Sequence, residues 1–574
     1  MSPRWTAVLI VSALFAASCS DDDAPAPLPS PTRTVMSAVP SAPSDSPTPT
    51  RRAAETATAI DTATARDTPT ASRTSTASPT PSPGATSTRT SANPEVTCDS
   101  LAGRTIGGAQ IRSTTLVTGT DRSTEYCRVL ATIAPQLNFE TRLPTSWNGR
   151  AAFTGGGGLN GVILPPNVIF FQPQAAFDGY VTIATDSGHQ GSFSDGAWAL
   201  GDPVALENFA YLSTHAVLGA AREIVRERYG IPPSRSYFIG ESTGGREGLI
   251  AAQRWPGDFD GIVALEPVYD MTALVLAENH IAQQVFTRPG AYLSAAKVRT
   301  LAQATLAACD DLDGIADGII SHVAACRFDP ATLRCAGPES DACLTDAQIE
   351  TVNTVHSALE LGFTLANGIH SYPGWPIGHE DGSGGWPTWI TGTSPSNPMS
   401  SLGFTISDQT LRYLITGDPN LDSLALSPAT HADELAAFSA LVDATDPNLA
   451  PFAGRGGKLI LWHGFADYGV SGYSTIRYYE RVVSSLGANA VDEFIRFYTS
   501  PGVDHLNGGP GAGTADYLGA LVAWVEQGTA PGDLVAHRFA GGPLSRPLCR
   551  YPRYPHYNGS GDPSSAESFH CAMP

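Results

Sequence analysis

Residues 238–248 read FIGESTGGREG, and the rest of the fold can be built outward from this stretch. Residues 240–244 (GESTG) have the G-x-S-x-G spacing of a nucleophile elbow, the sharp turn that lifts a serine hydroxyl out of a sheet. A strand candidate at residues 236–239 precedes the serine, and a helical pattern begins at Gly245. The stretch therefore predicts an α/β-hydrolase fold with Ser242 as the nucleophile; the alternative is a structural serine in a tight turn.

Two more strand candidates lie upstream, and each runs into glycines. Residues 150–154 (RAAFT) precede GGGGLNG, and residues 179–185 (GYVTIAT) precede DSGHQG. In this fold one donor of the oxyanion hole is the N–H group after the nucleophile, here that of Thr243, and the other belongs to a loop after an earlier strand. Glycines let backbone amides face a ligand. We therefore expect the second donor around Gly157 or Gly158, with Gly157 as the choice.

The chain order of this fold places an acid and then a histidine after the serine, each in a loop that follows its own strand. Residues 458–462 (KLILW) are followed by HGFADYG with Asp467, and residues 493–498 (EFIRFY) by TSPGVDHLNGGPG with His505. We expect His505 to take the serine proton and Asp467 to hold the imidazole tautomer. Asp504 is the rival acid, but as the sequence neighbour of the histidine it should point elsewhere. Three other histidines are expected to be structural or to support the site: His189, His215 and His463.

Size and charge exclude some functions. The chain has 574 residues and 42% hydrophobic content, enough for one large α/β domain with an insertion. Its 55 acidic and 34 basic residues give a formal net charge of -21, which leaves no basic excess to bind a phosphate backbone. We expect a small-molecule ester substrate and no nucleic acid.

The N-terminal region carries a predicted export signal and a linker. Residues 1–19 combine an arginine, an apolar run too short to span a bilayer, and small residues before Cys19. Cys19 resembles a bacterial lipoprotein cleavage site, and ordinary signal cleavage nearby is the alternative. Residues 20–96, rich in Pro, Ser, Thr and Ala, have too little apolar area to fold and are predicted to be a disordered tether. A secreted or surface-tethered protein is expected.

The other eight cysteines form an even set, which favours disulfides in an exported chain. No CxxC zinc pattern competes with this interpretation. Their clustering suggests four local pairs, although spacing alone permits other connectivities: Cys98–Cys127, Cys309–Cys326, Cys335–Cys343 and Cys549–Cys571.

The chain resembles the tannase/feruloyl esterase family of α/β hydrolases. The resemblance rests on GESTGGREGLIAAQRWPGDFDGIVALEP, LWHGFAD, GVDHLNGGPG, LVAWVEQGTAP and RPLCRYPRYPHYNGSGD, and it extends essentially from Cys98 to Pro574. It implies an α/β-hydrolase domain in two parts, residues 97–268 and 451–574, with a lid domain at residues 269–450 inserted between the serine and the acid.

The sequence departs from the family at two positions. In the family a cysteine precedes the serine and another follows the histidine, and a disulfide joins them; here Glu241 and Leu506 stand there. Without that bridge, packing and hydrogen bonds alone must position the loops of Ser242 and His505, where a displacement of about 1 Å can cost on the order of a hundredfold in rate. We expect activity to be retained. Glu241 is interpreted as a solvated elbow residue, with a compensating hydrogen bond as the alternative.

Residues 309–320 (CDDLDGIADGII) suggest a calcium site, because close carboxylates suit a hard cation and calcium is the usual one outside the cell. The stretch is not an EF-hand, since the twelfth residue counted from Asp310 is Ser321 rather than glutamate. An acidic surface turn is the alternative. The stretch resembles the lid calcium site of the family, which implies a structural Ca²⁺ held by three side chains and two carbonyl groups: Asp310, Asp313 and Asp317, and those of Ile315 and Ile319.

The resemblance implies a serine carboxylic ester hydrolase that cleaves aromatic acyl esters through an acyl-enzyme. Feruloyl or other hydroxycinnamoyl esters and galloyl esters are the leading substrates. Esters of short aliphatic acids, terephthalate-type monoesters and a catalytically weakened binding lipoprotein are the alternatives. The lid offers aromatic residues that could contact the substrate or only pack: Trp375, Trp386, Trp389 and Phe404.

Overall fold

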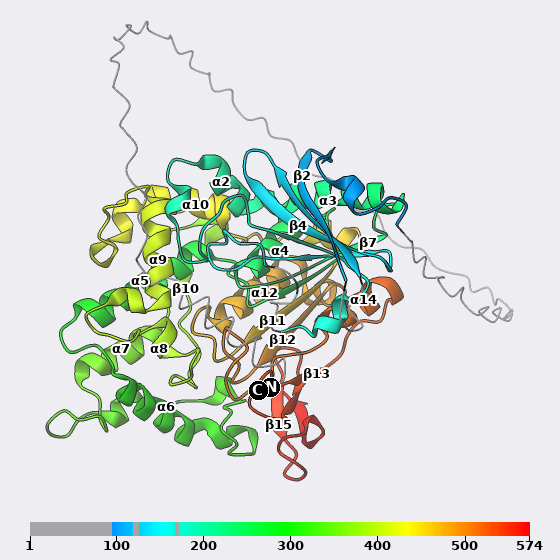
Figure 1. Ribbon diagram of the computed structural model, residues 1–574. Coiled ribbons are helices and arrows are strands. Elements are labelled where there is room, and N and C mark those ends of the chain that lie inside the picture. The colour runs from blue at the N-terminus through cyan, green and yellow to red at the C-terminus, as the bar shows by residue number, and fades with distance from the viewer. Residues whose placement is uncertain (1–93, 119–124, 165, 167–170) are drawn as a thin grey trace, which may run out of the picture. The chain divides into compact units, whose positions relative to one another are not determined.

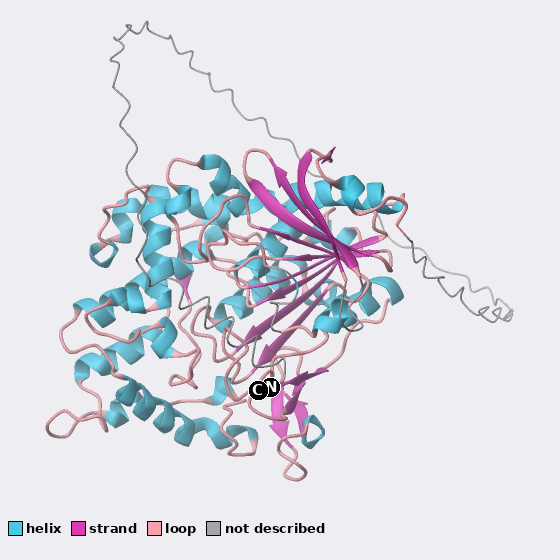
Figure 2. Cartoon of the chain, viewed as in Figure 1, coloured by secondary structure: helices cyan, strands magenta, loops and turns pink. Residues whose placement is uncertain are grey.

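A ten-stranded sheet runs through the centre of the fold, in the order β1-β2-β3-β4-β6-β5-β7-β8-β11-β12 (Figures 1 and 2). The structure is a computed structural model and describes residues 94–118, 125–164, 166 and 171–574. The predicted signal segment, Cys19 and the predicted linker up to residue 93 lie outside these residues. The strands of the sheet are β1 (Thr105–Ile106), β2 (Ala109–Val117), β3 (Tyr126–Ile133), β4 (Leu137–Pro144), β5 (Arg150–Thr154), β6 (Val181–Thr185), β7 (Arg235–Glu241), β8 (Gly261–Leu265), β11 (Lys458–Gly464) and β12 (Ile495–Ser500).

The sheet has an antiparallel part and a parallel part. Strands β1 to β4 pair antiparallel, and β4 pairs antiparallel with β6. From β6 to β12 every pairing is parallel. Ser242, Asp467 and His505 follow β7, β11 and β12, so all three lie beyond the carboxyl ends of parallel strands.

Helices lie on both sides of the parallel part of the sheet, and the side chains of β5, β7, β8, β11 and β12 alternate between two cores. Phe238 packs into one core with Leu249 of α4, whereas its neighbours Tyr237 and Ile239 pack into the other with Leu521 of α14. The first core also receives side chains from α3 and α12. The helices of the body are α2 (Pro203–Glu207), α3 (Ser213–Tyr229), α4 (Thr243–Arg254), α12 (Gly472–Leu486), α13 (Ala488–Asp492) and α14 (Tyr517–Gln527).

The segment between β8 and β11 is largely helical and has a third core, in which Trp375, Trp386 and Phe438 are buried. Most of its helices gather at the left of the sheet in Figure 1. They are α5 (Met271–Thr287), α6 (Ala295–Cys309), α7 (Asp346–His356), α8 (Trp386–Trp389), α9 (Leu402–Gln409), α10 (Ala432–Val442) and α11 (Ala450–Gly454). Three two-stranded sheets complete the structure: β9 (Leu359–Glu360) with β10 (Ser371–Tyr372), β13 (Leu534–His537) with β14 (Ser545–Leu548), and β15 (Tyr554–Tyr557) with β16 (Phe569–Ala572).

The predicted α/β-hydrolase fold class is confirmed. Helix α4 begins at Thr243, two residues before the predicted start at Gly245, because the elbow leads directly into its first turn. The antiparallel strands β1 to β4 were not predicted. Strand β2, for example, exposes many polar residues, so it lacks the continuous apolar run that marks a strand buried on both faces.

The four predicted disulfides are present. They join Cys98 to Cys127, Cys309 to Cys326, Cys335 to Cys343 and Cys549 to Cys571. Across the part of the chain that the structure describes, we find no helix with the length and apolar character needed to span a bilayer.

Candidate active site

The elbow holds Ser242 in an unusual backbone conformation, with φ 57° and ψ -122°. Positive φ is strained for a residue with a side chain, and such strain concentrates at functional sites. Two glycines make room for the turn. A Cβ on Gly240 would lie 2.6 Å from the carbonyl carbon of Gly244, and one on Gly244 would lie 2.7 Å from Gly156 O. The G-x-S-x-G spacing therefore reflects close backbone contacts on both sides of the serine.

The structure brings Ser242, His505 and Asp467 together. His505 Nε2 lies 3.0 Å from Ser242 Oγ, and His505 Nδ1 lies 2.7 Å from Asp467 Oδ2. The rival acid Asp504 does not contact the imidazole; its Oδ1 accepts hydrogen bonds from the N–H groups of Leu506 and Gly508, and so braces the histidine loop. The three side chains have the order and contacts of a serine hydrolase triad.

The electrostatics suit a general base. Burial alone would raise the pKa of Asp467, but the positive charge on His505 and hydrogen bonds from His463 and His505 outweigh it and lower that pKa to about 2. Burial favours the neutral form of His505, but the Asp467 carboxylate overcomes this effect and raises the pKa of the imidazole. The ionised Asp467 accepts a hydrogen bond from Nδ1–H, so the Nε2 lone pair faces the serine hydroxyl.

The three histidines expected to be structural or supporting have different neighbours. Buried His463 lies with Nε2 3.0 Å from Val470 O and 3.3 Å from Asp467 Oδ2, so it holds the acid loop. His189 stacks on Trp198, and its Nε2 lies 2.9 Å from Leu159 O beside the glycine loop. His215 stacks on a tryptophan and lies away from the triad: its partners are Asp258 and Trp255.

The glycine loop after β5 reaches the elbow. Thr243 Oγ1 donates a hydrogen bond to Gly158 O at 2.7 Å, and Glu247 Oε2 accepts one from Gly156 N at 3.0 Å. Within the described residues, the N–H groups of Gly157 and Gly158 donate no hydrogen bond. The N–H of Thr243 lies in the first turn of α4, where backbone donors have no partner within the helix. The loop can thus offer a second donor beside that of Thr243, as the choice of Gly157 requires.

Glu266, directly after β8, was not predicted from the sequence to belong to the site. It is fully buried, its φ is 45°, and its Oε2 lies 3.4 Å from His505 Nδ1. Burial, followed by the charge of Asp467, raises its pKa well above the usual value. A signal was available: a glutamate ends the otherwise apolar strand GIVAL (residues 261–265), where a charge is costly without a purpose.

One of the four aromatic residues named in the lid meets the triad. The ring of Trp389 stands edge-on to the imidazole of His505, with 5.2 Å between centroids. Trp375, Trp386 and Trp389 are all buried in the core that the inserted segment contributes to, and Phe404 is buried against Phe286. Trp389 is therefore the one of these residues that the structure places at the reacting groups.

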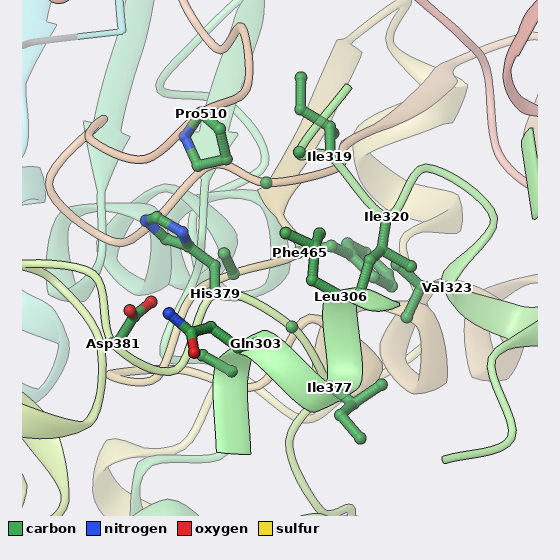
Figure 3. Close-up of a pocket in the computed structure, with 15 residues that line it drawn as sticks. Gln303, Leu306, Ile319, Ile320, Val323, Ile377, His379, Asp381, Phe465 and Pro510 are labelled. Carbon is green, nitrogen blue, oxygen red and sulfur yellow. The ribbon is translucent and has the colours of Figure 1, made fainter. Parts of the chain in front are cut away.

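A cavity of about 100 Å³ lies between α6 and the loops after β11 and β12 (Figure 3). Gln303, His379 and Asp381 line one side, and apolar residues such as Ile320 and Val323 line the other. Ser242 does not line it, so this cavity is not at the nucleophile.

The three aspartates of the predicted calcium loop differ in how many of their carboxylate oxygens already have a partner. Asp310 accepts hydrogen bonds from Gly318 N and Ile319 N, and Asp317 pairs with Arg546. Asp313 Oδ2 is buried and accepts no hydrogen bond from a described residue, and burial raises the pKa of Asp313 to about 6. Three side chains that could bind a metal have oxygen or nitrogen atoms within 4.8 Å of one another at one place in the described part of the chain: Glu266, Asp467 and His505. The aspartates of the predicted calcium loop do not meet this limit, so their carboxylate oxygens lie farther apart. An unpartnered buried carboxylate oxygen among acidic neighbours fits a hard cation, although Arg546 competes for Asp317.

Comparisons with known proteins show which family and fold the chain resembles. Residues 117–572 match the family described as tannase and feruloyl esterase. The chain is 35% identical over 502 residues to an uncharacterized esterase of Agrobacterium fabrum, covering 81% of this chain and 89% of that protein. It is 33% identical over 522 residues to the mono(2-hydroxyethyl) terephthalate hydrolase of Piscinibacter sakaiensis, covering 78% and 85%. The crystal structure of feruloyl esterase B from Aspergillus oryzae superposes with a TM-score of 0.72 at 25% identity, covering 83% of this chain and 100% of that one.

Proposed function

The chain belongs to the tannase and feruloyl esterase family and is a carboxylic ester hydrolase, and we propose that it cleaves aromatic acyl esters with Ser242 as the nucleophile. The preferred acyl groups are of the feruloyl, hydroxycinnamoyl or galloyl type. One observation carries the proposal: the hydrogen-bonded chain from Ser242 through His505 to Asp467, with the ring of Trp389 beside it. An aromatic acyl group next to the serine would find an apolar, flat partner in that indole.

The proposed reaction follows from the positions of the groups. His505 Nε2 takes the proton of Ser242 as the serine oxygen attacks the ester carbonyl, and Asp467 stabilises the imidazolium that forms. The N–H groups of Thr243 and Gly157 receive the developing oxyanion. The imidazolium then protonates the departing alcohol, and a water molecule activated by the same imidazole releases the acid from the acyl-enzyme.

A second substrate class has specific support. A relative with 33% identity over most of both chains is named mono(2-hydroxyethyl) terephthalate hydrolase, so a terephthalate monoester belongs in the same test. A terephthalate monoester is also an ester of an aromatic acid, and its hydrolysis would use the same serine, histidine and aspartate. Short aliphatic esters remain a competing proposal. The alignment of the triad counts against the binding-lipoprotein alternative.

The test is hydrolysis of methyl ferulate, methyl gallate, a terephthalate monoester and p-nitrophenyl acetate by the full chain and its Ser242→Ala variant. We expect turnover of at least one aromatic ester, and a fall of about 10⁴-fold or more in kcat in the variant, because the nucleophile is lost. Ser234→Ala, just before the opposite end of β7, is the matched serine control and should retain activity. Turnover of the acetate alone would contradict the aromatic assignment, and full activity of Ser242→Ala would contradict the assigned nucleophile.

We also propose that the loop at residues 309–320 binds a structural Ca²⁺ through Asp310, Asp313, Asp317 and the carbonyls of Ile315 and Ile319. The buried, unpartnered Oδ2 of Asp313 supports this. Calcium in excess should raise the melting temperature of chelator-treated protein by mass action. The Asp313→Asn variant should lose this calcium-dependent shift, and a shift of the same size in that variant would count against the site.

Export is the remaining proposal. The apolar run before Cys19 and the linker at residues 20–96 support secretion or a membrane tether through lipidated Cys19. Mass spectrometry of the mature N-terminus would distinguish a lipidated cysteine from ordinary cleavage.

A further inference from the structure

Glu266 stands at a junction of the catalytic machinery. It follows β8, which lies in the sheet between β7, leading to Ser242, and β11, leading to Asp467. Its N–H donates to Trp462 O at 2.8 Å, and its φ is 45°. A strained, fully buried glutamate in this place requires an explanation, since both strain and burial destabilise the chain unless surrounding contacts compensate.

The side chain of Glu266 connects two catalytic loops. Its Oε1 accepts a hydrogen bond from Gly464 N at 3.3 Å, and a Cβ on Gly464 would lie only 2.8 Å from that oxygen. Its Oε2 accepts no hydrogen bond from any described residue, and it lies 3.4 Å from His505 Nδ1. One carboxylate oxygen of Glu266, one of Asp467 and a ring nitrogen of His505 lie within 4.8 Å of one another. The imidazole therefore has two carboxyl groups on its Nδ1 side.

The two carboxyl groups cannot both ionise at low cost, because like charges at this separation in a buried site repel strongly. Asp467 is closer to the imidazole and also receives backbone hydrogen bonds from Gly469 and Val470, so the negative charge resides there. Burial first, and the charge of Asp467 second, raise the pKa of Glu266 well above its usual value. Glu266 therefore keeps its proton to a higher pH than Asp467 does. The titratable groups that face it are Asp467, Glu241, Asp504, His505 and Tyr517.

We propose that Glu266 is a positioning residue for the esterase reaction: it fixes the imidazole of His505 beside Asp467, and it becomes the carboxylate partner of His505 when Asp467 is removed. The proposal rests on the proposed function and deepens it. It also gives a physical means of holding the histidine loop in a chain where Glu241 and Leu506 replace the bridging cysteines that the family resemblance implies. Glu266 links that loop to the end of β11 through buried contacts instead of a covalent bond.

The test is a double-mutant cycle of Glu266→Gln and Asp467→Ala in the full chain. The measured quantities are kcat and KM for the best ester, the rate at which a fluorophosphonate labels Ser242, and the pKa of His505 from the NMR shift of its ring C–H. Glutamine keeps the shape of the neutral acid but cannot ionise. The matched control is Asp443→Asn, which removes another buried carboxyl whose hydrogen-bond partners are Thr272 and Ser439 rather than the triad.

We expect Glu266→Gln alone to lower kcat by about three- to tenfold with little change in KM, because it loosens His505 without touching the substrate. Asp467→Ala should retain slow labelling and a raised His505 pKa, since the loss of the neighbouring charge lets Glu266 ionise. Adding Glu266→Gln should then slow labelling by a further factor of about ten or more and lower the His505 pKa. Asp443→Asn should leave the His505 pKa unchanged.

The proposal is overturned if the two substitutions act independently, so that the double variant shows only the product of the single effects and the His505 pKa is the same with and without Glu266. The NMR measurement requires neither turnover nor labelling. It therefore tests Glu266 even if no aromatic ester is hydrolysed or Ser242 is not labelled, and either of those results would count against the proposed function alone.

Discussion

The catalytic centre and the inserted segment between β8 and β11 are held together in different ways. The inserted segment contains two of the four disulfides and most of an apolar core that it shares with residues of the body such as Leu159 and Phe209. No cysteine of the described disulfides lies in the loops of Ser242, Asp467 or His505, and those loops are fixed by buried hydrogen bonds and ion pairs. A displacement of about 1 Å in a hydrogen-bonded triad can cost on the order of a hundredfold in rate, even where the overall fold is kept. Damage to the catalytic centre should therefore appear in the rate of hydrolysis, and damage to the inserted segment in the thermal stability.

Arg246 shows how the two regions are joined. It is fully buried on α4, one turn after the nucleophile, and donates hydrogen bonds to the carbonyls of Phe209, Ala210 and Val442. The first two carbonyls belong to the π-helical turn at residues 208–212, where the wider turn changes the usual helical hydrogen-bond pattern. Val442 ends α10 of the inserted segment. A single guanidinium therefore ties the elbow helix to the insertion without a covalent bond.

The largest expected effect comes from a single methyl group in the catalytic centre. In Gly158→Ala the new Cβ would lie 2.3 Å from Phe193 O, at a residue with φ 54°. The glycine loop must shift, and Gly157 N–H would leave the position in which it is proposed to bind the oxyanion. We expect kcat to fall on the order of a hundredfold, while the strained alanine lowers the melting temperature by only a few degrees. Ester hydrolysis and thermal unfolding of the purified variant are the measurements.

Gly219→Ala is the matched control, because that helical glycine has no atom within 4 Å of a new Cβ. It should leave kcat unchanged and, by removing a flexible residue from α3, slightly stabilise the fold. Equal kcat in Gly158→Ala and the wild type would mean that the glycine loop does not supply an oxyanion donor.

The reverse pattern is expected in the inserted segment. The cysteines of the Cys335–Cys343 bridge are separated by 8 positions, and replacing both by alanine should cost about 2 kcal/mol of stability through the freed chain entropy of the unfolded state. Because the bridge lies outside the catalytic loops, kcat should stay within about twofold. Thermal unfolding and ester hydrolysis would be measured side by side. A large loss of kcat with unchanged thermal stability would contradict the expectation that this bridge affects stability and not catalysis.

Five of the parallel strands, all except β8, could be predicted from sequence because they are short apolar runs, several of them followed by glycine, and because the fold has the chain order serine, acid and histidine. Strand β5 agrees with the prediction at both ends, Arg150 and Thr154. The two local disulfides of the inserted segment agree with the pairs that cysteine clustering suggested, although spacing alone left other connectivities open. These features depend on neighbours in the sequence.

Features that depend on distant contacts could not be predicted. Glu266 and His505 are 239 positions apart in the printed sequence, by subtraction of their numbers, and no periodicity connects them. The same holds for Trp389, whose contact with His505 exists only after the inserted segment folds onto the body. The antiparallel strands β1 to β4 were missed because outward-facing polar residues interrupt their apolar positions.

The smallest expected effect is the response to pH, which should have opposite signs in the two regions. In the centre, the pKa of His505 is raised above the ordinary value of 6.5, so the fraction of neutral base grows as pH rises through that raised pKa. The acid limb of kcat/KM should therefore have its midpoint above 6.5.

In the inserted segment, burial raises the pKa of Asp443 from 3.8 to about 7 and that of Glu380 from 4.5 to about 7. A carboxyl whose folded pKa exceeds its unfolded pKa stabilises the fold fully below the unfolded value and loses that contribution as pH rises through the folded value.

Melting temperatures measured from pH 5 to pH 8 should thus fall by a few degrees over the range in which kcat/KM rises. Asp443→Asn, which is neutral at every pH, should flatten the fall in stability without moving the acid limb, because its hydrogen-bond partners lie in α5 and α10. If the substitution also shifts the midpoint of the acid limb, the Asp443 carboxyl is electrostatically coupled to His505. The two regions then do not titrate independently. If the acid limb stays in place while the stability curve flattens, the chain uses buried carboxyl groups for two separable purposes: charge beside the imidazole, and neutral packing in the insertion.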